Sequence, residues 1–196
     1  MLVKTRKAQY IRAVRKALLR GLLIFSPLLF NGTHVLKAQK NDDFPSIEWS
    51  EDRPLEWKDY PFVIFRSGKR ELAITSVKHS VRGYLRNETP DFEVKVLFVA
   101  EDSWTSDTTN TRLLAHEQLH FDIGELYRRK IVNKIERLRK TGEKQKAIYR
   151  YAIQKLLSDF RIFSEEYDKE TQYGNLPEIQ RKWQIKVWDE LNRLHR

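Results

Sequence analysis

The chain has 196 residues, enough for one domain with a substantial core, and it contains no cysteine. This excludes disulfides, thiol nucleophiles and thiolate metal ligands. The formal net charge is +10, but residues 1–38 hold eight Lys and Arg and no Asp or Glu. Of the 37 basic residues, 37 − 8 = 29 remain in residues 39–196 against 27 acidic ones, which does not favour a nucleic-acid-binding protein.

Residues 1–38 are typical of a secretory signal peptide. A basic segment runs to Arg20 and is followed by the apolar run GLLIFSPLLF, Gly21–Phe30. This run is about half the length of the roughly 20 residues that a membrane span needs. We therefore expect cleavage near Ala38, contact with the membrane only through this segment, and one exported domain over residues 39–196. An uncleaved membrane anchor is the alternative.

The rest of the chain divides into a β-rich part and a helical part. Residues 41–62 mix aromatic and acidic residues with proline and predict an ordered segment held by its aromatic side chains. Strand-like runs cover residues 62–66, 71–85 and 92–100, with turns at 67–69 and 87–90. Apolar residues then follow a helical period, which predicts helices over 110–140, 143–172 and 178–194. The predicted fold class is α+β, a small and mainly antiparallel sheet followed by three helices.

The first predicted helix carries His116-Glu117-Gln118-Leu119-His120, an H-E-x-x-H sequence typical of zincin-like metallopeptidases. Four residues make about one helical turn, so both imidazoles project from one face and can bind one Zn²⁺. Glu117 is rotated by about 100° from His116, so its carboxylate can act as general base on a water that zinc polarises. The alternative is two histidines packed at a helix–helix contact.

A glycine and a downstream acidic segment bear on the third metal ligand. Gly124 lies one turn beyond His120, where glycine costs about 1 kcal/mol relative to alanine in a helix. We expect another segment, carrying the third ligand, to approach closely there. In the second helix, Glu170 lies about 60° from the apolar line that ends at Tyr167, which favours it as that ligand, whereas Asp168 points further away. A solvated acidic helix end is the alternative for Ser164–Glu170.

Several motifs together resemble a bacterial family of unknown function whose members are described as secreted zinc-dependent proteases. They are HEQLHFDIGELYRR (His116–Arg129), Ser103-Trp104, YDKETQYG (Tyr167–Gly174), Gln180, Trp183, IEWSEDRPLEWKDY (Ile47–Tyr60) and AITS (Ala73–Ser76). The resemblance covers about residues 45–190. It implies a periplasmic or secreted zinc peptidase that acts on a peptide or protein, with His116 and His120 as ligands and Glu117 as base.

One position departs from the family. Its downstream motif has the form YD-x-ET-x-HG, and the histidine of that motif is an attractive third ligand. Tyr173 stands at this position here. Either Tyr173 binds the metal weakly, or Glu170 or Asp168 takes the role, or the site is impaired.

The remaining candidate residues favour structural roles. His34, His79 and His195 are expected to be structural or solvent-exposed, and no nucleophile-elbow sequence surrounds Ser103. Trp104 either lines the cleft or is buried in the core. The strand over residues 92–100 is either an edge that could bind an extended peptide or a central strand. The leading hypothesis is a zinc peptidase, and the alternative is a catalytically silent periplasmic or envelope binding protein on the same fold.

Overall fold

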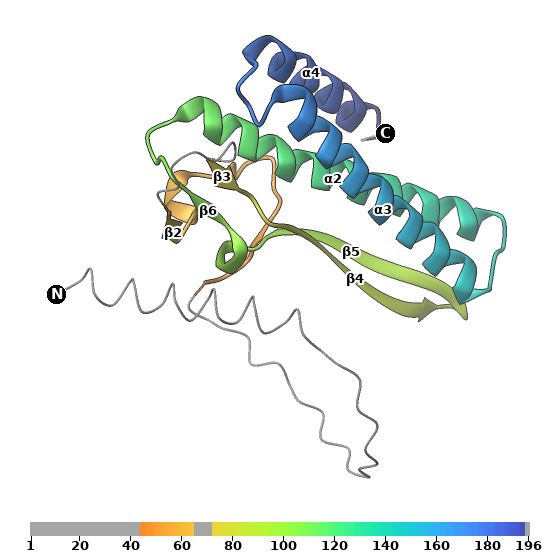
Figure 1. Cartoon of the computed structure of the whole chain (residues 1–196). Coiled ribbons are helices and arrows are strands. Elements are labelled where there is room, and N and C mark those ends of the chain that lie inside the picture. Colours follow the sequence, from red (N-terminus) through yellow and green to blue (C-terminus); the bar gives the residue numbers. More distant parts are fainter. Residues whose placement is uncertain (1–43, 65–71, 195–196) are drawn as a thin grey trace, which may run out of the picture. The chain divides into compact units, whose positions relative to one another are not determined.

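The computed structural model describes residues 44–64 and 72–194, which form two small sheets and three helices (Figure 1). The strands are β1 (Ile47–Glu48), β2 (Phe62–Val63), β3 (Ala73–Ile74), β4 (Val77–Arg86), β5 (Thr89–Phe98) and β6 (Trp104–Thr105). Short 3₁₀ helices η1 and η2 cover Trp57–Asp59 and Ala100–Asp102. The helices are α2 (Thr111–Lys140), α3 (Lys146–Thr171) and α4 (Pro177–Arg193). The expected signal peptide, the turn at residues 67–69 and His195 lie outside the described residues.

The α+β class and the order of sheet before helices are as predicted, but the sheet differs in detail. The first sheet, in the order β1-β5-β4, is antiparallel throughout. A second sheet has the order β2-β6-β3, and β2 pairs with β6 in parallel. Strands β2 and β3 lie within the predicted runs 62–66 and 71–85, and the second of these runs is divided into β3 and β4. Strand β6 was not predicted, because two residues show no alternation that a sequence pattern could reveal.

The hairpin β4–β5 is the largest β element, and its turn is tighter than predicted. Asn87 and Glu88 are the two turn residues, and both have positive φ, at 50° and 61°, as a type I′ turn requires. Because the turn takes only these two residues, β5 starts at Thr89 and Pro90 belongs to the strand. The predicted strand over 92–100 therefore begins and ends too late. Near Pro90, β5 has only β4 as a neighbour among the described strands, so a missing N–H is tolerated.

The three predicted helices are confirmed to within three residues at every end. The side chain of Asn110 caps α2 by accepting a hydrogen bond from the Leu113 amide at 3.0 Å. Gln172 has a left-handed backbone, with φ 50°, and ends α3. Pro177 occupies the first turn of α4, where its missing N–H has no helical partner to lose. Within the described residues, no helix is long and apolar enough to cross a membrane.

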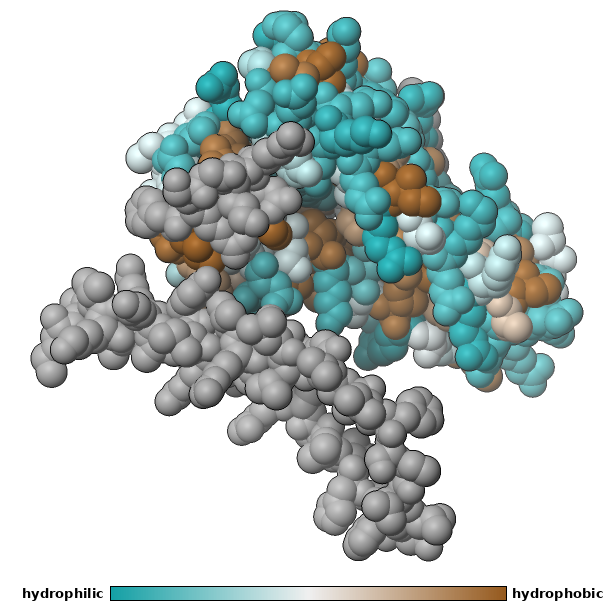
Figure 2. All heavy atoms as spheres, in the orientation of Figure 1, coloured by the Kyte–Doolittle hydropathy of each residue, from teal (hydrophilic) through white to brown (hydrophobic). Residues whose placement is uncertain are grey.

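Helix α2 packs against the first sheet on one side and against α3 and α4 on the other (Figure 1). The predicted aromatic segment before β2 is ordered, and its Leu55 and Tyr60 are buried with Phe98 and Phe121 between β5 and α2. A separate apolar cluster joins the three helices. Figure 2 shows hydrophobic residues in separate patches on an otherwise largely hydrophilic face.

Gly124 marks the close approach of the sheet to α2. A Cβ at this position would lie 2.7 Å from Val77 Cγ1 on β4 and 3.0 Å from Val96 Cγ1 on β5. A close approach was expected from the sequence, but the expectation that the approaching segment carries the third ligand is wrong. The glycine lets α2 lie directly on the hairpin, whose residues facing Gly124 are Val77 and Val96 and offer no metal-binding side chain.

Candidate metal centre

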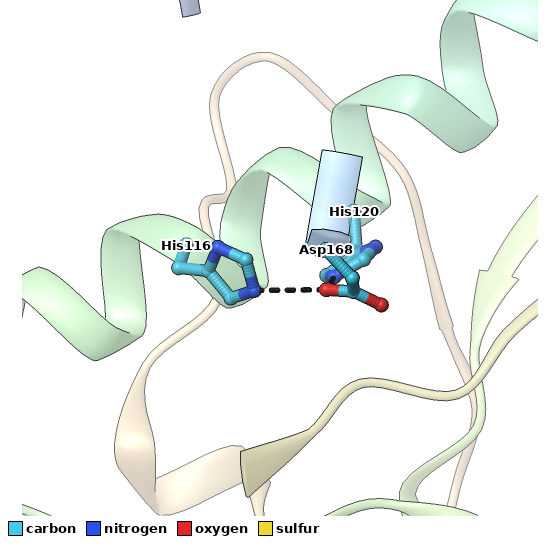
Figure 3. A group of neighbouring side chains, drawn as sticks. All are labelled: His116, His120 and Asp168. Atoms are coloured by element: carbon cyan, nitrogen blue, oxygen red, sulfur yellow. Dashed lines mark hydrogen bonds and ion pairs between the residues drawn. The ribbon is translucent and has the colours of Figure 1, made fainter. Parts of the chain in front are cut away.

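His116 and His120 on α2 and Asp168 on α3 point toward one another (Figure 3). The Nε2 atoms of His116 and His120 lie 3.1 Å and 2.9 Å from Asp168 Oδ1. Each of the three residues offers one ligand atom, and these atoms lie within 4.8 Å of one another. This group of side chains could hold a metal ion.

The structure brings Asp168, and not Glu170, to the two histidines. Glu170 Oε2 accepts a hydrogen bond from Trp183 Nε1 at 2.7 Å, so its carboxylate contacts α4. Tyr167 is fully buried, and Asp168 and Glu170 follow it on opposite edges of the inward face of α3. Helical spacing identifies these two edges but does not tell which of them faces α2. Tyr173, the other alternative, lines a pocket together with these two histidines and Asp168, and its backbone is left-handed, with φ 58°.

The imidazole of His116 is held on several sides. Its Nδ1 lies 3.1 Å from Gln180 Oε1, and the same oxygen accepts a hydrogen bond from the Tyr167 hydroxyl at 2.7 Å. The Tyr167 ring stacks on His116 with centroids 4.6 Å apart. A Cβ on Gly174 would lie 3.0 Å from His116 Cγ, and the φ of this glycine is +78°. These contacts fix the direction in which Nε2 points.

The hydrogen-bond chemistry of this group fits a cation. A neutral imidazole carries one N–H, yet both ring nitrogens of His116 meet an oxygen, Gln180 Oε1 and Asp168 Oδ1. If Nδ1 donates to Gln180, the Nε2 lone pair faces a carboxylate that is itself an acceptor. A metal ion among the three donor atoms would satisfy this lone pair together with His120 Nε2 and Asp168 Oδ1.

The pKa values of Asp168 and His120 depend on each other. Burial alone would raise the pKa of Asp168, but hydrogen bonds from His116 and His120 outweigh it and hold that pKa well below its usual value. Burial would lower the pKa of His120, and the bond to Asp168 outweighs it and raises that pKa. Asp168 therefore stays negative, which is the state that a metal ligand requires, whereas His120 would have to release its proton when a metal binds.

Glu117 is buried beside this group and is held by a chain of hydroxyl groups. The Thr75 side chain donates to the Glu117 carboxylate, so the Tyr60 hydroxyl, 2.6 Å from Thr75 Oγ1, must donate to Thr75. Glu117 Oε2 has no hydrogen-bond partner among the described residues. Burial raises the pKa of Glu117, and the neighbouring His120 and His116 partly offset this. A buried carboxylate with a free oxygen and a raised pKa is suited to accept a proton near neutral pH.

A pocket of about 300 Å³ opens onto this group. Its polar part is formed by His116, Glu117, His120, Asp168, Tyr173, Ser164 and Thr75, and its apolar part by Leu72, Ala73, Ile74, Val77, Leu113 and Phe160. The Ser164 hydroxyl is buried and has no hydrogen-bond partner among the described residues. In this pocket the Glu117 carboxylate and the group of His116, His120 and Asp168 lie beside an apolar surface formed by residues of β3, β4, α2 and α3.

Comparison with known protein families gives a match over part of the chain. Residues 89–174 match the model of a bacterial protein of unknown function (DUF922). The matched segment runs from β5 to the turn after α3 and includes His116, Glu117, His120 and Asp168. It is narrower than the expected resemblance, and the description of the family assigns it no activity. No curated protein and no solved structure matches the chain.

Residues outside the matched segment also support the site, and reasoning from spacing did not find them. Tyr60, Thr75 and Gln180 hold the base and one histidine from three separate parts of the chain. They lie in motifs that carried the family resemblance, which was the only available signal. No rule of local spacing connects them with α2.

His79 has the structural role predicted for it. Its Nε2 lies 2.8 Å from the Gly124 carbonyl oxygen, and its ring packs edge-on against Phe160 with centroids 4.8 Å apart. Both contacts join β4 to the helices. His34 and His195 lie outside the described residues.

Ser103 and Trp104 are also part of the framework. The Ser103 hydroxyl donates to the Val99 carbonyl at 2.8 Å and accepts from the Ser76 amide at 3.0 Å. These bonds fix the chain between β5 and β6. Trp104 is buried in β6, so of the two predicted roles the core one holds.

Proposed function

We propose that this protein is an exported zinc-dependent hydrolase, a peptidase of the zincin-like type, in which Glu117 is the general base. The observation that carries the proposal is the convergence of His116, His120 and Asp168 beside the buried, half-satisfied carboxylate of Glu117. Two imidazoles and one carboxylate are a ligand set that zinc uses in catalytic sites with an open position. When bound, zinc would supply Lewis-acid polarisation of water and of a substrate carbonyl.

The residues of the chain would have separate tasks. His116, His120 and Asp168 would hold the ion, with His116 oriented by Gln180. Glu117 would take a proton from the attacking water at its free Oε2 and pass it to the leaving amine. Thr75 and Tyr60 would hold that carboxylate in place.

The surroundings of the pocket support an extended peptide as substrate. Of the two possibilities for strand β5, an edge that binds a peptide or a central strand, the second holds, because β1 and β4 lie on either side of it. The edge strand at the pocket is β3, which pairs only with β6 among the described strands and contributes Ala73 and Ile74 to the pocket wall. An extended peptide could add to such an edge and place its side chains against the apolar wall.

Two successive measurements, first of zinc binding and then of hydrolysis, test the proposal. Purified protein is expected to bind one zinc ion per chain, and His116→Ala is expected to abolish binding. Hydrolysis of an unstructured protein substrate is then expected to be lost in Glu117→Gln while zinc stays bound. A wild-type protein that does not bind zinc under saturating conditions would defeat the proposal.

A second function is a catalytically silent periplasmic or envelope binding protein. It is favoured by Tyr173, which lies in the pocket wall at the position where the resembling family has a histidine. Zinc binding without hydrolysis, in both the wild type and Tyr173→His, would support this function. Gain of hydrolysis in Tyr173→His alone would instead indicate an impaired peptidase.

A further inference from the structure

Helix α4 lies in the groove between α2 and α3, and its contacts show which kind of helix this groove can bind. Its Trp183, Val187 and Leu191 are buried in the cluster that joins the three helices. Its acidic side chain Glu190 forms an ion pair of 2.7 Å with Lys130 on α2. The groove thus holds a helix by an apolar stripe and by a cation of α2 that meets an acid of that helix.

Beyond the end of α4, next to Leu194, a groove between α2 and α3 has no occupant among the described residues. This part has a volume of about 490 Å³ and is lined by Lys130, Asn133, Lys134, Arg137, Leu138, Ile148, Tyr151, Ala152, Lys155, Leu156, Asp159 and Leu194. Leu138, Ala152 and Leu156 are half-buried, and Ile148 and Tyr151 are exposed, Tyr151 to 72%. The open part of the groove is therefore apolar, like the part that α4 occupies.

The row of cations on α2 also continues into the open part. Lys130, Lys134 and Arg137 are spaced four and three residues apart, so they lie on one face of the helix. Lys130 meets Glu190, whereas no hydrogen bond or ion pair joins the side chains of Lys134 and Arg137 to the described residues. Residues 128–155 hold eleven Lys and Arg and only two Asp and Glu.

We propose that the open part of the groove binds an acidic amphipathic helix of a partner protein. Apolar residues of that helix would cover Ile148 and Tyr151, and its acidic residues would meet Lys134 and Arg137 as Glu190 meets Lys130. From residue 130 to residue 138, α2 is about 12 Å long, which matches roughly two turns of a helix. A second copy of this chain in a two-fold contact is disfavoured, because it would bring the same cations against each other.

A pair of synthetic helical peptides tests the proposal on the full chain. Both have 14 residues and one leucine stripe, and the stripe is flanked by glutamates in one peptide and by lysines in the other. Fluorescence anisotropy is expected to show saturable binding of the glutamate peptide and none of the lysine peptide. Tyr151→Ala, which removes an exposed ring, is expected to weaken binding by about fivefold without affecting folding.

Charge reversal distinguishes a specific site from general attraction. The double variant Lys134→Glu/Arg137→Glu is expected to weaken binding of the glutamate peptide by at least about tenfold and to allow binding of the lysine peptide. Arg181→Glu/Lys182→Glu makes the same charge change on the exposed surface of α4 and is expected to change binding by less than about twofold.

Each other outcome would overturn the proposal. An equal loss in the control variant would mean that only the net charge matters. Failure of the glutamate peptide to bind would exclude a helix of this kind. Charge-reversal-sensitive binding of vesicles rich in anionic lipid, or of duplex DNA, without binding of the peptide would assign the surface to a membrane or a nucleic acid. None of these measurements depends on a metal or on hydrolysis.

Discussion

Gln180 on α4 holds the imidazole of His116 on α2, with Oε1 of the amide 3.1 Å from Nδ1 of the ring. The orientation of one ring of the candidate metal group therefore depends on α4, which supplies none of its three donor atoms. Partners of this kind fix the tautomer and the direction of a ligating histidine, and their loss typically costs 10- to 100-fold in metal affinity.

The first prediction concerns this contact. Gln180→Leu is expected to lower zinc affinity by about 10- to 100-fold, measured by competition with a chromophoric chelator. Tyr167→Phe removes the hydroxyl that donates to Gln180 Oε1 and to the His116 carbonyl oxygen but leaves the contact between Gln180 and His116 Nδ1, so its effect should be smaller. Equal zinc affinity in Gln180→Leu and the wild type would mean that Gln180 does not orient the ligand.

The second prediction identifies the third ligand by a matched pair of substitutions on α3. Asp168→Asn is expected to lower zinc affinity by more than about 100-fold, because it removes the only carboxylate that contacts both histidines among the residues that the structure describes. Glu170→Gln is expected to retain zinc, because the amide oxygen can still accept the bond from Trp183. Loss of zinc in Glu170→Gln together with retention in Asp168→Asn would reverse the assignment.

The third prediction concerns the hydroxyl chain behind Glu117. Thr75→Val conserves shape but removes the partner of both the Tyr60 hydroxyl and the Glu117 carboxylate, so unfolding free energy is expected to fall by about 1–3 kcal/mol. Thr75→Ser keeps the hydroxyl and is expected to lose less than about 1 kcal/mol. Urea unfolding with the metal removed measures both.

A second measurement distinguishes a connected series of hydrogen bonds from a loss of packing alone. Burial raises the pKa of Tyr60, so its phenol stays protonated as a donor. Tyr60→Phe and Thr75→Val act on one chain and should therefore be non-additive when combined. Strict additivity of the two substitutions would contradict a connected chain.

The helices and the two histidines could be predicted because both depend on local spacing. Apolar residues at helical intervals define α2, α3 and α4, and four residues place His116 and His120 on one face. The choice between Asp168 and Glu170 depends on which side of α3 faces α2, a tertiary property. Gly124 indicated a close approach correctly, but no pattern shows that the hairpin is what approaches.

Net charge also concealed a local feature. The near balance of charges over residues 39–196 argued against a basic surface, yet residues 128–155 are strongly basic. The acidic residues that offset them lie elsewhere in the chain. A charge count over a whole domain is therefore a weak test for a basic surface. A count over a single segment, such as residues 128–155, detects one.

The fourth prediction concerns acid stability through His79. Burial lowers the pKa of His79, and the bond to the Gly124 carbonyl and the nearby Glu125 only partly offset this, while Arg128 adds to it. The unfolded chain, with an ordinary histidine pKa of about 6.5, therefore takes up a proton more readily than the folded one. The stability that His79 contributes is full above that pH and falls as the pH drops below it.

Comparison with His79→Gln isolates this contribution from other titrating groups. The difference in unfolding free energy between the wild type and His79→Gln, from urea titrations at pH 7.5 and pH 5.5, is expected to shift against the wild type at the lower pH. A difference that is the same at both pH values would contradict a depressed pKa at His79.

The fifth prediction concerns the contact between α2 and the hairpin at Gly124. Alanine is favoured over glycine in a helix by about 1 kcal/mol, but here its Cβ would lie 2.7 Å from Val77 Cγ1. Overpacking of this kind costs about 1–3 kcal/mol, so Gly124→Ala is expected to lower the unfolding free energy despite the better helix propensity. Val77→Ala removes the clashing methyl groups, so the double variant should lose less than the sum of the single losses. A more stable Gly124→Ala variant would show that the hairpin yields easily and that the close approach does not require the glycine.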